Sequence, residues 1–86
     1  MIMAGWWMPK GQLKILREMS AGATLWRDSK GRFFIGPDKI NCTVSAKALF
    51  NKSFIMPDHR VVNGLDTMRI TPTGENEMGY NRHQVL

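Results

Sequence analysis

Apolar residues recur at helical spacing near the start of the chain. Four of them fall on one helical face: Leu13, Ile15, Leu16 and Met19. Because side chains three and four positions apart lie together on a helix, this spacing predicts an amphipathic helix with a charged opposite side. Pro9 suits the first helical position, where the amide hydrogen that it lacks would have no partner. We therefore predict a helix over residues 9–21, closed by Gly22.

Two later segments combine short β-prone runs with turn-forming residues, and they predict β-hairpins. The first covers residues 23–36 and turns near Gly31, which can adopt a positive φ. The second covers residues 60–70 and turns at Asn63-Gly64, a dipeptide typical of two-residue type I′ turns. We expect both hairpins to pack with the helices around one core.

A second helix is predicted between the hairpins, over residues 45–53, which contain neither Gly nor Pro. The hydroxyl of Thr43 or of Ser45 would satisfy a free amide at its start. The residues expected to face inward are Val44, Ala48 and Leu49. The residues expected on the outside or flank are Ser45, Ala46, Lys47, Asn51 and Lys52. Residues 39–42 before this helix fit either a short strand or a loop.

The last predicted element is a short third helix over residues 73–78. Thr71 supplies a capping hydroxyl, and Pro72 supplies a helix-starting residue. The order of elements is helix, hairpin, helix, hairpin and short helix, which makes an α+β fold. The expected core consists of Leu13, Leu16, Leu25, Phe33, Ile35, Leu49, Ile55 and Ile70.

At 86 residues, the chain has room for one domain. We place it at residues 9–78, between an apolar arm over residues 1–8 and a tail over residues 79–86 that we expect to be flexible. The single cysteine, Cys42, allows no internal disulfide and fits a reducing, cytoplasmic setting. No apolar run reaches the roughly 18–20 residues of a membrane-spanning helix, so we expect no membrane partner.

Residues that carry enzyme chemistry are sparse. Cys42, His59 and His83 are widely spaced and follow no metal-ligand pattern. The chain also lacks the glycine-rich loops that hold nucleotide phosphates. We therefore expect a protein that is not an enzyme, with no catalytic residues, no metal and no cofactor.

Basic residues outnumber acidic ones by twelve to seven, which gives a net charge of +5. Residues 1–74 hold eleven of the basic residues against five acidic ones and so carry +6. A cationic surface favours binding to a phosphate backbone, because neutralised phosphates release counterions. The same charge is ordinary for a small domain that only needs to stay in solution. Charge alone leaves both interpretations open.

Three segments resemble the skeleton of small winged-helix proteins: residues 13–19 (LKILREM), 44–55 (VSAKALFNKSFI) and 68–74 (MRITPTG). In length and order the chain is similar to compact winged-helix proteins of phages and other mobile elements, including the YjhX-type candidate toxins. The resemblance implies a small winged-helix-like domain that binds double-stranded DNA as a transcriptional regulator or accessory factor. One difference is that residues 23–36 predict a hairpin, where a usual winged helix has the helix before its recognition helix.

The resemblance implies that the second helix is the recognition helix and that the second hairpin is the wing. The helix would reach base edges or phosphates, and basic residues of both hairpins would contact the backbone. The expected DNA-contacting residues are Arg27, Lys30, Arg32, Ser45, Lys47, Asn51, Lys52, Arg60 and Arg69. Without the resemblance, the same side chains fit an ordinary solvated surface.

An alternative function is binding to a protein, as a phage-type inhibitor of a host complex or as a small toxin. Trp6, Trp7 and Met8 would then form the partner surface or a homodimer contact, because tryptophan is enriched at interface hot spots. The other interpretation places these three residues in the core of so small a domain.

Overall fold

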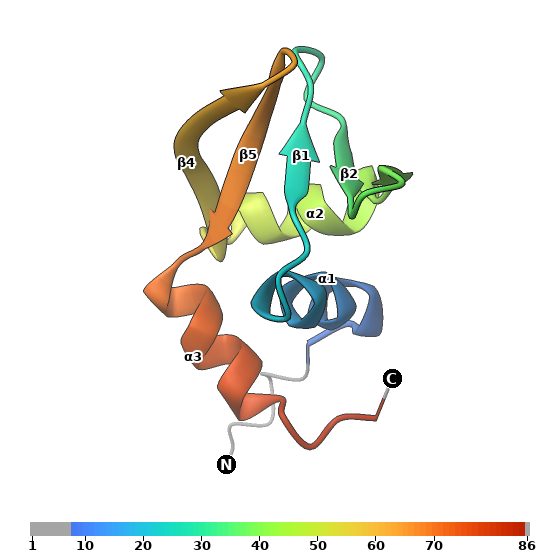
Figure 1. Cartoon of the computed structure of the whole chain (residues 1–86). Coiled ribbons are helices and arrows are strands. Elements are labelled where there is room, and N and C mark those ends of the chain that lie inside the picture. The colour runs from blue at the N-terminus through green and yellow to red at the C-terminus, as the bar shows by residue number, and fades with distance from the viewer. Residues whose placement is uncertain (1–7, 86) are drawn as a thin grey trace.

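The computed structural model describes residues 8–85, which form three α-helices and five β-strands (Figure 1). In chain order these are α1 (Lys10–Ser20), β1 (Leu25–Arg27), β2 (Phe33–Ile35), β3 (Ile40–Asn41), α2 (Thr43–Asn51), β4 (Ile55–Val62), β5 (Leu65–Ile70) and α3 (Pro72–Tyr80). The predicted order of helices and hairpins is confirmed, and the fold is α+β. Residues 39–42, which the sequence left as either a short strand or a loop, contain the short strand β3.

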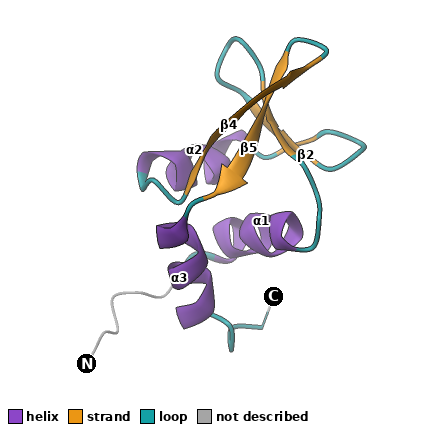
Figure 2. Cartoon of the chain, turned by 60° about the vertical axis from the view of Figure 1, so that its left-hand side comes forward, coloured by secondary structure: helices purple, strands orange, loops and turns teal. Residues whose placement is uncertain are grey.

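The strands form one antiparallel sheet in the order β3-β2-β1-β5-β4. β1 pairs with β2 on one side, where Leu25 lies opposite Ile35, and with β5 on the other, where Leu25 lies opposite Met68. The two hairpins are therefore joined through strands that are far apart in sequence. Their turns lie at the same end of the sheet and point away from the helices (Figure 1, Figure 2).

The helices and one face of the sheet enclose a small core. The expected core residues that are buried are Leu13, Leu16, Leu25, Phe33, Ile35, Leu49 and Ile55. Ile70 packs against this cluster but is only partly buried. Met8 is also buried, with 4% of its surface exposed, so for this residue the core interpretation holds. Trp6 and Trp7 lie outside the described residues.

Helix α2 is rotated about its axis relative to the prediction. Val44, which was expected inside, is 86% exposed, whereas Ala46, which was expected outside, is fully buried beside Leu49. The contacts at the start of the helix explain the difference. The Thr43 hydroxyl accepts a hydrogen bond at 3.0 Å from the Phe33 amide of β2 and does not cap α2, so the predicted hydroxyl cap is wrong. This bond holds the start of α2 against β2 and directs Ala46 into the core.

The second hairpin turns where it was predicted to turn but is longer. Asn63 and Gly64 have φ angles of +52° and +80°, as a type I′ turn requires. A bulge between Pro57 and Val61 interrupts the pairing of β4 with β5, and pairing continues on both sides of it. The sequence pattern predicted only the part of β4 that follows the bulge.

The end of the described chain packs back on α1. Thr71 caps α3 as predicted, and α3 extends beyond its predicted end to Tyr80. In the segment assigned to a tail, Asn81 and Gln84 are buried. The Arg17 guanidinium of α1 donates to the backbone carbonyls of both residues, at 3.1 and 2.9 Å. These bonds tie residues 81–84 to the helical end of the molecule.

Candidate nucleic-acid interface

One face of α2 carries polar groups that have no partner within the described chain. Val44, Lys47 and Asn51 follow one another at three- and four-residue spacing, so they share the side opposite to buried Ala46 and Leu49. All three are exposed. Within residues 8–85, neither the Lys47 ammonium nor the Asn51 side-chain amide makes a hydrogen bond or ion pair. This face is free to offer hydrogen bonds to another molecule.

Two other predicted contact residues of this region face α1 instead. A Cβ atom at Gly11 of α1 would come within 2.8 Å of Ser45 Oγ, so the glycine makes room for the half-buried serine. Lys52, just after α2, donates from Nζ to Gln12 Oε1 of α1 at 2.9 Å. Ser45 and Lys52 therefore hold α1 against α2, apart from the exposed face.

Three arginines that the sequence assigns to phosphate contacts have acidic partners. The nitrogen–oxygen distances are 3.0 Å for Arg27–Asp66, 2.7 Å for Arg32–Asp28 and 3.6 Å for Arg60–Asp58. A carboxylate beside each guanidinium reduces the positive potential that a phosphate would meet there. The other two predicted cations of the hairpins, Lys30 and Arg69, are exposed and have no acidic partner within residues 8–85.

Hydrogen bonds keep two of these carboxylates charged. The Arg32 backbone amide donates to Asp28 at 2.8 Å, and this bond is the main cause that lowers the pKa of Asp28 below its ordinary value of 3.8. The Thr67 hydroxyl donates to Asp58 and is the main cause that lowers the pKa of that carboxyl, assisted by the Arg60 amide. Both aspartates are therefore ionised at neutral pH and stay paired with their arginines.

Arg27 also connects α2 to the sheet. Its guanidinium bonds to Asp66 of β5 and lies 5.4 Å from the centroid of the Phe50 ring on α2. The Phe50 ring in turn lies 6.2 Å from the Phe33 ring of β2, in a tilted arrangement. These contacts fix the end of α2 relative to both hairpins. Arg27 is thus a positioning residue for the exposed face of α2.

A second basic surface lies on the side of the sheet opposite to the core. Trp26 and Phe34 are paired across β1 and β2, and each alternates with core residues, so both point away from the core. Lys39 Nζ lies 4.9 Å from the centroid of the Trp26 ring, and the Arg32 guanidinium lies 5.8 Å from that of Phe34. No pattern in the sequence pointed to Lys39, because only the turn after β2 brings this residue back to the sheet.

Within the described part of the chain, metal-binding side chains do not gather and the Cys42 thiol is not activated. Residues 8–85 contain no cluster of three or more His, Cys, Asp or Glu side chains that could hold a metal ion. Burial raises the pKa of Cys42 to about 11, so its thiol is protonated at neutral pH and is a poor nucleophile. None of the helices in the same residues is long and apolar enough to cross a membrane.

The chain matches no protein family, no curated protein and no solved structure. Its function is therefore inferred from its own residues and their arrangement.

Proposed function

We propose that the protein is a small winged-helix-like DNA-binding protein, a transcriptional regulator or accessory factor that binds double-stranded DNA through α2. The observation that carries the proposal is the exposed face of α2. There Val44, Lys47 and Asn51 point away from the core, and the two polar side chains have no partner within residues 8–85.

The three side chains match features of the DNA major groove. The Lys47 ammonium can donate to guanine O6 and N7, and the Asn51 amide can pair with adenine N6 and N7. Val44 can pack on the methyl group of thymine, which is the apolar feature of this groove. Val44 lies in the first turn of α2, and the first turns of a recognition helix are the part that contacts base edges. The face thus combines a cation, an amide and an apolar contact.

The surroundings of α2 support the same interpretation. The β4–β5 hairpin follows α2 directly, as a wing follows a recognition helix, and β1 pairs with β5 to complete a three-stranded unit. Ser45 and Lys52 brace α2 against α1. The chain differs from a usual winged helix in residues 23–36, where β1 and β2 stand in place of the helix before the recognition helix. A rigidly held helix with a bare polar face suits insertion into a groove.

The test compares two charge reversals of equal size, Lys47→Glu on α2 and Arg82→Glu after α3. Arg82 is exposed, and its segment lies at the opposite end of the molecule from the hairpin turns (Figure 1). Binding to a fluorescein-labelled random-sequence duplex is measured by anisotropy at a series of salt concentrations. We expect steep salt dependence for the wild type, because bound cations release counterions from the duplex. Lys47→Glu should weaken binding and reduce the salt slope by about one.

Arg82→Glu lowers the net charge equally and should leave the slope close to that of the wild type. The proposal is overturned if the wild type does not bind duplex even at low salt. It is also overturned if the two variants weaken binding equally, because the effect would then follow from net charge and not from the face of α2.

A further inference from the structure

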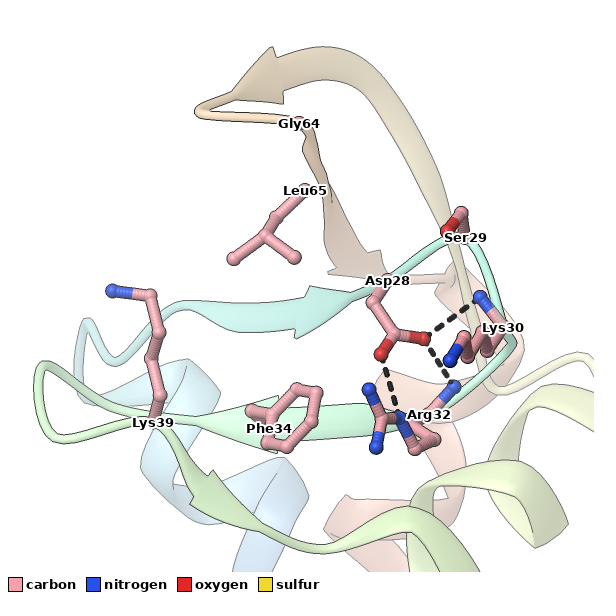
Figure 3. Close-up of a pocket in the computed structure, with 8 residues that line it drawn as sticks. All are labelled: Asp28, Ser29, Lys30, Arg32, Phe34, Lys39, Gly64 and Leu65. Carbon is pink, nitrogen blue, oxygen red and sulfur yellow. Dashed lines mark hydrogen bonds and ion pairs between the residues drawn. The ribbon is translucent and has the colours of Figure 1, made fainter.

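The surface between the two hairpin turns is hollowed and has an aromatic side chain in it. A hollow of about 480 Å³ is lined by Asp28, Ser29, Lys30, Arg32, Phe34, Lys39, Gly64 and Leu65 (Figure 3). Its volume lies within the roughly 300–1,000 Å³ typical of small-ligand sites. The lining comes from the β1–β2 turn, from β2 and the segment after it, and from the β4–β5 turn with the start of β5. The hollow therefore exists only because the sheet brings the two hairpins together.

The charges around the hollow are mostly positive. Arg32 is paired with Asp28 at 2.7 Å, so these two side chains nearly cancel. Lys30 and Lys39 have no acidic partner within the described residues and leave the rim with an excess of two positive charges. In Figure 3, Lys39 lies on one side of the Phe34 ring and Lys30 on the other. The half-buried Phe34 ring in the hollow therefore has an unpaired lysine on each side.

The aromatic ring and the unpaired lysines together indicate which kind of ligand the hollow would bind. An aromatic ring favours a flat, polarisable group, and free ammonium groups favour an anion. A nucleotide carries both, as a base and a phosphate. Single-stranded nucleic acid is bound in general by positively charged grooves with aromatic side chains on which the bases stack. Because lysines lie on two sides of the hollow and it is open to solvent, a nucleic-acid backbone could enter on one side and leave on the other.

We propose that this hollow binds one nucleotide of an unpaired strand of nucleic acid, with the base on Phe34 and the flanking phosphates near Lys30 and Lys39. The site is on the side of the sheet away from the core, whereas α2 packs on the core side. It is therefore separate from the duplex-binding face and does not depend on the function proposed for α2. The two surfaces can be altered independently.

The test measures binding of a fluorescein-labelled oligothymidine by anisotropy at low salt. Phe34→Leu removes the ring and keeps an apolar side chain, and Lys39→Gln removes one rim charge. The matched controls are Tyr80→Leu, an exposed aromatic residue of α3, and Lys14→Gln, an exposed lysine of α1. We expect each of the two site variants to lose at least about fivefold in affinity, as loss of one stacked base or one phosphate contact does. The controls should stay within about twofold.

Four unlabelled competitors define what the site recognises. Unlabelled oligothymidine and oligouridine should compete, since both have stacking bases and a phosphate backbone. Thymidine monophosphate at equal nucleotide concentration should compete far less, and equal competition would overturn the assignment to a strand. A blunt duplex that competes as well as the single strand, and that loses affinity equally in Phe34→Leu, would overturn the assignment to unpaired bases.

The other possible results of these binding measurements also test the single-strand proposal. Absence of oligothymidine binding by the wild type, or equal binding by site and control variants, overturns the proposal. If circular dichroism shows that Phe34→Leu is unfolded, Lys39→Gln and Lys30→Gln decide in its place, because both residues are exposed. Lys47→Glu should keep oligothymidine binding while its duplex binding weakens. A failure of the α2 proposal alone is thereby distinguished from a failure of this one.

Discussion

The basic residues of the hairpins and Lys47, the one basic residue of α2, were all predicted to contact DNA, but their electrostatic settings differ. Arg27, Arg32 and Arg60 of the hairpins each stand beside a carboxylate. Helix α2 contains no acidic residue, and its Lys47 has no partner within residues 8–85. A count of cations therefore overstates what the hairpins can offer to a phosphate. What matters is which carboxylates lie beside each cation, whether they are near in the chain, as for Arg32 and Arg60, or brought in by strand pairing, as for Arg27.

The largest expected effect is on stability, and it tests how α2 packs on the core, since this packing decides which side of α2 is exposed. Leu49→Ala should lower the free energy of unfolding by about 2–5 kcal/mol, because Leu49 is fully buried and its loss leaves a cavity. Val44→Ala on the same helix should change it by no more than about 0.5 kcal/mol, because Val44 is exposed. Urea denaturation measures both. Similar losses for the two variants would mean that α2 is rotated from the orientation described here.

The next effect distinguishes base recognition on α2 from charge alone. Asn51→Ala should cost roughly 1–3 kcal/mol on a preferred sequence and relax the preference at one base pair, because an amide that pairs with adenine reads one position. Selection from a randomised duplex library, followed by binding measurements on single-base variants, supplies the comparison. An equal loss of affinity for all sequences would mean that Asn51 contacts the DNA backbone and not a base.

A smaller effect tests whether the hairpin arginines are masked by their partners. Asp28→Asn removes the carboxylate charge beside Arg32 and keeps an oxygen that can accept from the Lys30 and Arg32 amides. The released guanidinium should increase affinity for duplex at low salt and steepen the salt slope by about 0.9 for a new phosphate contact. An unchanged slope would show that this turn stays away from the backbone, and α2 would then act without it.

The smallest effect concerns pH. The folded-state pKa of Asp58 is below its ordinary value of 3.8, so its ionised form stabilises the fold above that value. This contribution is lost as the pH falls through the lower folded-state pKa. The difference in unfolding free energy between the wild type and Asp58→Asn should therefore be largest near neutral pH and shrink below about pH 4. Urea denaturation across this range measures it. A difference independent of pH would mean that the charge of Asp58 does not matter to the second hairpin.

Local signals in the sequence were sufficient for much of the fold. The spacing of Leu13 and Leu16 predicted α1, Asn63-Gly64 predicted the second turn, and Thr71 predicted the start of α3. In each case the deciding interactions join residues within a few positions of one another. Such interactions are encoded in a short stretch of chain.

The rest depends on contacts between distant residues. Helix α2 has small or apolar residues on several sides, so its inward face is decided by Thr43 against Phe33 and by Ser45 against Gly11. In the candidate site, Lys47 and Asn51 were predicted to be exposed and are exposed. Val44 was missed because its valine side chain suggested burial. The partner of Arg27 was missed for a similar reason, since Arg27 and Asp66 meet only after β1 pairs with β5. The partners of Arg32 and Arg60 lie only four and two residues away in the sequence, so a search for nearby opposite charges could have found them.

The bulge in β4 has a consequence for self-association. β4 is the last strand of the sheet, so its outer edge has no neighbour in the described chain and is the kind of edge on which a second chain can add a strand. Pro57 has no amide hydrogen for such a ladder, and the bulge between Pro57 and Val61 bends the strand and breaks its register. An added strand could pair regularly only along the few residues beyond the bulge. The irregularity that interrupts the pairing of β4 with β5 thus also limits growth of the sheet into aggregates.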